Sequence, residues 1–160
     1  MSYDRRAAVR YAHEWVYRRN PQYYDFSELG GDCTNFVSQA LFAGGISMDK
    51  TPDGWYYRSP DDRAPAWTSV GKLYEYGTRK KSKGLTLTEI PLEQVQVGDI
   101  IQLSFRRGEW GHSLFVVHAG NPPDASNVLI AAHSNDNNFR PLSTYGRAIE
   151  YRALQVGFKE

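Results

Sequence analysis

The chain lacks the features that mark several common classes of protein. It has one cysteine in 160 residues, so it can form neither an intrachain disulfide nor a cysteine-rich zinc site. Its 19 basic and 18 acidic residues nearly cancel, which argues against nucleic acid or an anionic membrane as a partner held by charge. No stretch approaches the roughly 20 apolar residues of a membrane span. The N-terminus lacks the apolar core of a signal peptide.

The remaining composition predicts one folded domain over residues 1–160, with 41% hydrophobic residues for its core and no repeat or low-complexity linker. Helical spacing of apolar residues comes first along the chain, and strand-like alternation follows. This order predicts an α+β domain. Helices are expected over 4–19, 33–43 and 68–77, an ordered loop over 46–66, and strands over 85–90, 97–103, 112–119, 127–133 and 148–158.

Cys33 opens the second predicted helix, directly after Gly30 and Gly31, which let the backbone turn sharply. Unpaired N–H groups and the positive end of the helix dipole stabilise a thiolate, so this place predicts a pKa below the free value of roughly 8.5. Asp32 is expected to cap the helix by accepting from an amide of its first turn. The alternative is a cysteine that is only a small buried hydrophobe.

A nucleophilic thiol needs a base, and the base needs a third group that fixes its orientation. His13 lies within the first packing helix, and His118 lies about 20 Å along an extended strand from His112. His112 opens its strand after a glycine-bearing turn, and His133 ends the partner strand of the expected antiparallel hairpin. The pattern therefore favours His112 and His133 beside Cys33.

Several motifs together resemble the bacterial putative amidase domain family, a branch of the papain-like cell-wall hydrolases that includes NlpC-like and CHAP peptidases. The similarity runs over nearly the whole chain, and its first block is the most specific. The motifs are Gly30-Gly31-Asp32-Cys33-Thr34-Asn35-Phe36-Val37-Ser38-Gln39, Gly44-Gly45, Trp110-Gly111-His112-Ser113, Ala131-Ala132-His133-Ser134 and Arg140-Pro141-Leu142.

The resemblance implies a papain-like fold, in which the helix of the nucleophile packs on an antiparallel sheet that carries the base. Cys33 would be the nucleophile, His112 the base and His133 the orienting group. Asn135 and Asp136 follow His133 closely, and either could take the third role instead.

A tyrosine upstream of the cysteine borders the active site in NlpC-like enzymes, and Tyr23 or Tyr24 matches that place, with Asp32 beside the cysteine. The irregular block 46–66 lengthens the stretch between cysteine and histidine, and we expect it to shape the substrate cleft. Trp55, Trp67 and Trp110 are the aromatic candidates for that cleft.

The implied reaction is hydrolysis of an amide through a thioester, with backbone N–H groups stabilising the oxyanion. It needs no metal or organic cofactor. The expected substrate is peptidoglycan, at a stem-peptide or sugar-peptide amide, and the expected location is extracytoplasmic or in the cell wall. The alternatives are an acyltransferase on the same fold and an inactive cell-wall binding module that uses Trp55, Tyr56, Tyr57, Trp67 and Trp110.

Overall fold

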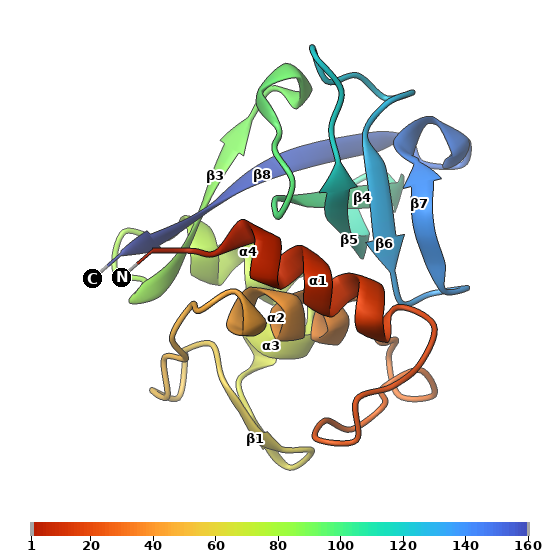
Figure 1. Cartoon of the computed structure of the whole chain (residues 1–160). Helices are drawn as coiled ribbons and strands as arrows, with labels where there is room; N and C mark the ends of the chain where they lie inside the picture. The colour runs from red at the N-terminus through yellow and green to blue at the C-terminus, as the bar shows by residue number, and fades with distance from the viewer. Residues whose placement is uncertain (1, 160) are drawn as a thin grey trace.

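The computed structural model describes residues 2–159 and has helices on one side of an antiparallel sheet (Figure 1). Along the chain the elements are α1 (Arg5–Trp15), α2 (Cys33–Ala43), β1 (Tyr57–Ser59), β2 (Asp62–Arg63), α3 (Pro65–Thr68), α4 (Val70–Thr78), β3 (Gly84–Ile90), the 3-10 helix η1 (Leu92–Gln94), β4 (Ile100–Arg106), β5 (Glu109–His118), β6 (Leu129–Ala132), β7 (Asn137–Pro141), the 3-10 helix η2 (Leu142–Thr144) and β8 (Glu150–Lys159).

Six strands form the main sheet in the order β3-β8-β4-β5-β6-β7, and every neighbouring pair is antiparallel. Apolar side chains cover both of its faces. Phe115 and Val117 of β5 join the core shared with the helices, whereas Leu114 and Val116, one residue out of phase, join a second cluster on the opposite face. This alternation is the expected result of the two-residue period of a strand.

Asp4 caps the start of helix α1, because its carboxylate accepts from the Ala7 N–H at 3.0 Å. Its Ala8 and Ala12 are fully buried, which lets α1 lie close to α2. Helix α2 is buried along most of its length and packs on β5 and β6. The packing of α2 on β5 places its first residue, Cys33, beside Ser113 of that strand.

The predicted α+β organisation is confirmed, as are the helices that begin near residues 5, 33 and 70 and the β5–β6 hairpin. The first helix is shorter than expected and ends at Trp15. Block 46–66 is not only a loop, because it contains β1 and β2 and the start of α3. The papain-like fold stays a prediction. None of the helices within residues 2–159 has the length and apolar character needed to span a membrane.

Candidate active site

Cys33 is the first residue of α2 and lies at the bottom of a surface hollow, with 9% of its surface exposed. Gly30 and Gly31 precede it with φ values of +87° and +99°, a backbone region that glycine adopts without strain. The next helical residue, Thr34, hydrogen-bonds through its hydroxyl to that of Ser113 on β5, at 2.9 Å. This bond ties the start of α2 to the strand that carries His112.

The electrostatic surroundings of the thiol differ from the prediction. Burial raises the pKa of Cys33, and hydrogen bonds from the main chain of Ser113, from the Thr34 hydroxyl and from the main chain of Thr34 oppose that effect only in part. The negative charge of Asp32 raises the pKa further. The predicted lowering of the thiol pKa is therefore wrong for the free protein, because loss of solvent outweighs the helix dipole.

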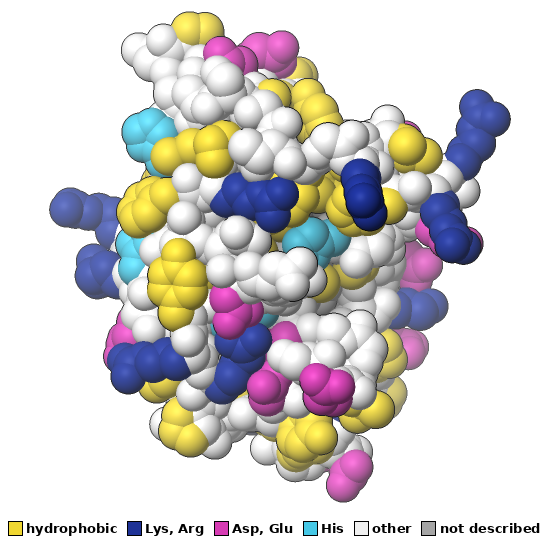
Figure 2. All heavy atoms as spheres, turned by 90° about the vertical axis from the view of Figure 1, so that its right-hand side faces the viewer, with side chains coloured by type: hydrophobic (Ala, Val, Ile, Leu, Met, Phe, Trp, Pro, Cys, Tyr) yellow, Lys and Arg dark blue, Asp and Glu magenta, His cyan; other side chains and the backbone are white. Residues whose placement is uncertain are grey.

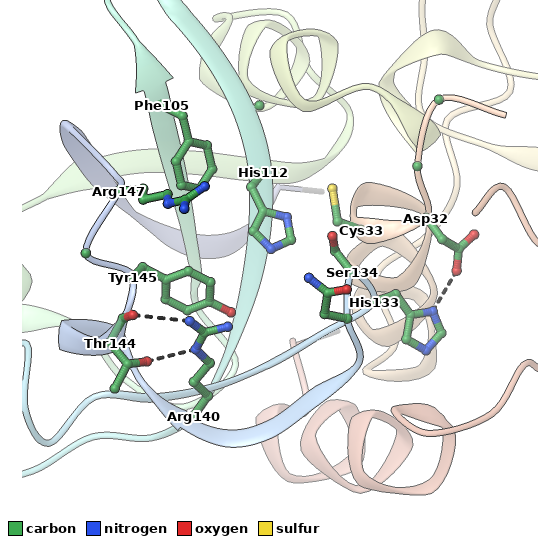
Figure 3. Close-up of a pocket in the computed structure, with 15 residues that line it drawn as sticks. Asp32, Cys33, Phe105, His112, His133, Ser134, Arg140, Thr144, Tyr145 and Arg147 are labelled. Atoms are coloured by element: carbon green, nitrogen blue, oxygen red, sulfur yellow. Dashed lines mark hydrogen bonds and ion pairs between the residues drawn. The ribbon is translucent and has the colours of Figure 1, made fainter. Parts of the chain in front are cut away.

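His112 lines the same hollow as Cys33, next to the Ser113 residue that contacts α2 (Figure 3). Burial, and secondarily the positive charge of Arg140, lower the pKa of His112 to about 4. Its ring meets that of Tyr145 edge-on, with centroids 6.0 Å apart. The ring makes no side-chain hydrogen bond to any residue in 2–159. At neutral pH this imidazole is uncharged and can accept a proton.

His133 follows β6 and is buried against α1 and α2. Its Nδ1 lies 2.6 Å from Asp32 Oδ2, its Nε2 lies 2.8 Å from the Trp15 carbonyl, and its ring stacks on Phe36. Arg19 Nη1 is farther from Nε2, at 3.2 Å. Asp32 Oδ2 is therefore the close partner of Nδ1, and the Trp15 carbonyl is the close partner of Nε2. The ring of His133 therefore bonds to Asp32 and to the Trp15 carbonyl, and it does not bond to His112.

Asp32 stands before α2, but its side chain does not cap the helix, contrary to the prediction. The carboxylate accepts instead from the Phe26 N–H at 2.8 Å, from Asn35 Nδ2 at 2.9 Å and from His133. These side-chain and main-chain donors occupy both carboxylate oxygens, so neither oxygen accepts from a main-chain N–H of the first turn of α2. The N–H groups of that turn are left without a capping side chain, which keeps them available to an oxyanion.

Asn135 and Asp136, the two other candidates for the group that orients His112, lie in different surroundings in the turn after His133. Asp136 forms an ion pair with Arg19 at 3.0 Å. Asn135 instead lines the hollow with Cys33 and His112, and its amide makes no hydrogen bond within residues 2–159. Its φ of +55° is a left-handed conformation that asparagine tolerates better than most residues.

Two hollows meet at Cys33. The larger, about 540 Å³, contains His112 and the side chains around it, and Figure 2 shows a histidine flanked by basic groups near the centre of this face. The other, about 410 Å³, is bordered by Trp110 and by the start of α4. Both include Gly30, Cys33 and Gly111. A chain-like substrate can therefore pass over the thiol and fill space on both sides of it.

The aromatic residues predicted to border the active site lie in different parts of the structure. Trp55 and Trp67 are fully buried and contact each other in the core, so the prediction that they line the cleft is wrong. Trp110 borders the smaller hollow, where the Arg152 guanidinium stacks on its ring at 4.0 Å. Tyr23 packs against Trp67, and neither Tyr23 nor the exposed Tyr24 lines a hollow at Cys33.

Sequence reasoning assigned no role to Tyr145 and Arg147, which both line the larger hollow. They follow η2, outside every motif, so no spacing signal marks them. Arg140 also lines this hollow, and it is the only charged residue of the Arg140-Pro141-Leu142 motif, which could have marked it as a candidate site residue. No group of three His, Cys, Asp or Glu side chains within the described chain is arranged to hold a metal ion.

The described structure is thus an α+β domain with a cysteine at a helix start and a histidine lining the same hollow. Residues 2–155 match the model of the putative amidase domain family, and the chain belongs to this family. The family description points to hydrolysis of amides.

Two relatives come from Bacillus subtilis (strain 168). The uncharacterized protein YhbB is 34% identical over 166 residues, covering 96% of this chain and 50% of that protein. The uncharacterized protein YjcM is 28% identical over 127 residues, covering 74% of this chain and 29% of that protein. The chain thus spans half of the length of YhbB and less than a third of the length of YjcM. No solved structure matches the chain.

Proposed function

We propose that the protein is a cysteine-dependent amide hydrolase of papain-like fold that acts on peptidoglycan, at a stem-peptide or sugar-peptide amide. The observation that carries the proposal is the placing of Cys33 and His112 in one hollow, with α2 tied to β5 by the Thr34–Ser113 hydrogen bond. Family membership supports the class of bond. The substrate rests on the resemblance to NlpC-like enzymes.

In the proposed mechanism Cys33 and His112 are both uncharged before substrate binds. His112 takes the thiol proton as the sulfur attacks the amide carbon, so no preformed ion pair is needed. N–H groups at the start of α2 stabilise the oxyanion. His112 then gives the proton to the leaving amine, and water hydrolyses the thioester with His112 again as base.

The third role goes to Asn135 in this proposal. His133 was the first expectation, but Asp32 and the Trp15 carbonyl occupy its ring nitrogens. Asn135 borders the hollow with an amide that has no partner in the described chain, and an amide can orient a neighbouring imidazole. His133 and Asp32 then serve as positioning residues, because they hold α1, the start of α2 and the end of β6 together.

The test is mass spectrometry of muropeptides before and after incubation with the purified protein. Wild type should release fragments, and Cys33→Ala should release none while keeping the circular dichroism spectrum of wild type. Unchanged masses across a broad muropeptide panel would refute the cell-wall substrate. Transfer of the acyl group to an added amine would indicate an acyltransferase instead.

A cell-wall binding module is the remaining alternative. Three of its five proposed stacking residues, Trp55, Tyr57 and Trp67, are buried and unavailable to a ligand. Binding to peptidoglycan that survives Cys33→Ala, combined with no turnover by wild type, would nevertheless favour it.

A further inference from the structure

The larger hollow holds two arginines that no carboxylate neutralises. Arg140 comes from β7 and Arg147 follows η2, and within residues 2–159 neither forms an ion pair with an acidic side chain. The acidic residue of the same hollow is Asp32, whose oxygens accept from three donors on the protein. Figure 3 shows both arginines on the side of His112 that is remote from Asp32.

Arg140 is held in place by its neighbours. Its Nε donates to Thr144 Oγ1 at 2.8 Å and its Nη2 to the Thr144 carbonyl at 3.1 Å, and the guanidinium lies 3.7 Å from the Tyr145 ring centroid. These contacts leave Nη1 without a hydrogen bond in the described chain. A guanidinium fixed in this way binds a planar anion with little further loss of side-chain freedom.

Tyr145 adds its hydroxyl group to the part of the larger hollow that Arg140 lines. Its hydroxyl is shielded from solvent and lies near the positive charge of Arg140, but it forms no well-aligned hydrogen bond among residues 2–159. A buried hydroxyl without a partner is costly, and a ligand oxygen placed there would satisfy it. The hollow therefore combines two free positive charges with a hydroxyl donor.

We propose that Arg140, Arg147 and Tyr145 form a carboxylate-binding subsite that selects substrates with a free carboxylate near the scissile amide. Arg140 Nη1, Arg147 and the Tyr145 hydroxyl would hold the carboxylate, and Cys33 would attack the amide on the other side of His112. The inference rests on the proposed function and narrows its substrate to an acidic peptide or an N-acyl amino acid, in which a free carboxylate lies near the amide.

Two thiol reagents test the subsite without turnover. Bromoacetyl-glycine and bromoacetyl-glycinamide differ only in a terminal carboxylate or carboxamide. With each, the sulfur of Cys33 forms a bond to the methylene carbon, bromide leaves with the electron pair of the broken bond, and the thiol proton passes to the buffer. Because the chain has one cysteine, intact mass at pH 8.5 reports this site alone.

The measured quantity is the rate with the carboxylate reagent divided by the rate with the carboxamide reagent. For wild type we expect a ratio roughly tenfold above that of N-acetylcysteine, since hydrogen bonds to charged groups are worth more than neutral ones. Arg147→Gln should bring the ratio toward that of N-acetylcysteine, and added salt should lower it. The matched control is Arg10→Gln, an exposed arginine on α1, which should keep the wild-type ratio. Equal ratios for wild type and N-acetylcysteine would overturn the proposal. Equal ratios for Arg147→Gln and Arg10→Gln would overturn it as well.

A second measurement needs no reactive thiol. The arginine Nε–H signals of wild type are followed by NMR during titration with N-acetylglycine and N-acetylglycinamide, and Arg147→Gln assigns one of them. Shifts caused only by the carboxylate support the subsite, and no difference between the two compounds overturns it. Selective labelling by a protein that leaves every muropeptide unchanged would refute the proposed function while the subsite stands.

Discussion

Replacing His112 by glutamine should remove much of the acid sensitivity of the fold. The pKa of His112 falls from 6.5 in a free chain to about 4 in the folded protein, mainly by burial. The unfolded chain therefore binds more protons between these values, and the folded state loses stability as the pH falls from 6.5 towards 4. The whole shift corresponds to about 3 kcal/mol, of which about 2 kcal/mol should be lost between pH 7 and pH 5.

The assay is urea unfolding of wild type and His112→Gln at pH 7 and pH 5. His112→Gln lowers stability at both pH values, but its loss on acidification should be smaller than that of wild type by about 2 kcal/mol, or about 4–8 °C in Tm. The matched control His118→Gln, on the exposed end of the same strand, should lose as much as wild type. Equal losses for wild type and His112→Gln would show that burial does not keep this ring neutral, and the proposed base would need revision.

Three further predictions follow from the site. Asp32→Ala should cost about 3 kcal/mol in urea unfolding because it leaves buried donors unpaired, whereas Asp32→Asn should cost clearly less, since its amide oxygen can still accept from the Phe26 N–H and from Asn35 Nδ2; equal costs would contradict the assigned hydrogen bonds. Asn135→Gly preserves the positive φ and removes the amide, so it should lower kcat with little change in Tm; wild-type kcat would exclude Asn135 from the third role. Cys33 should react with iodoacetamide more slowly than free cysteine at pH 6, because burial raises its pKa, and faster labelling would refute that direction.

The elements that the sequence predicted are those with a strong local signal. Three helices and the β5–β6 hairpin have a clear period in their apolar residues, and glycine pairs mark the start and end of α2. Strand β7 was missed because Asn137–Pro141 has no alternation of apolar and polar residues and is half exposed. Its pairing with β6 depends on the turn after His133, which no local pattern specifies.

The sequence predicted that Cys33 and His112 lie together, and they line one hollow, but it did not predict their electrostatic surroundings. Motifs marked Cys33 and His112, but burial depends on the whole fold and could not be judged from spacing. A helix N-terminus stabilises a charge by about 0.3–1 kcal/mol, less than one pKa unit, and removal of water can shift a pKa by several units in the other direction. The same limit applies to Trp55 and Trp67, which a sequence cannot distinguish from cleft aromatics.

A substrate carboxylate bound at the proposed subsite should raise the pKa of the proposed base, His112. Arg140 contributes to the low pKa of His112, and a substrate carboxylate bound there would offset that charge. The base would then be stronger in the complex than in the free protein, which favours proton transfer from Cys33 only when substrate is present. Because kcat/KM reports the free enzyme and kcat the complex, the acid limb of kcat should lie at higher pH than that of kcat/KM. Arg140→Gln should bring the two limbs together. Coincident limbs in wild type, measured on a carboxylate-bearing muropeptide, would show that the arginine does not couple substrate binding to the base.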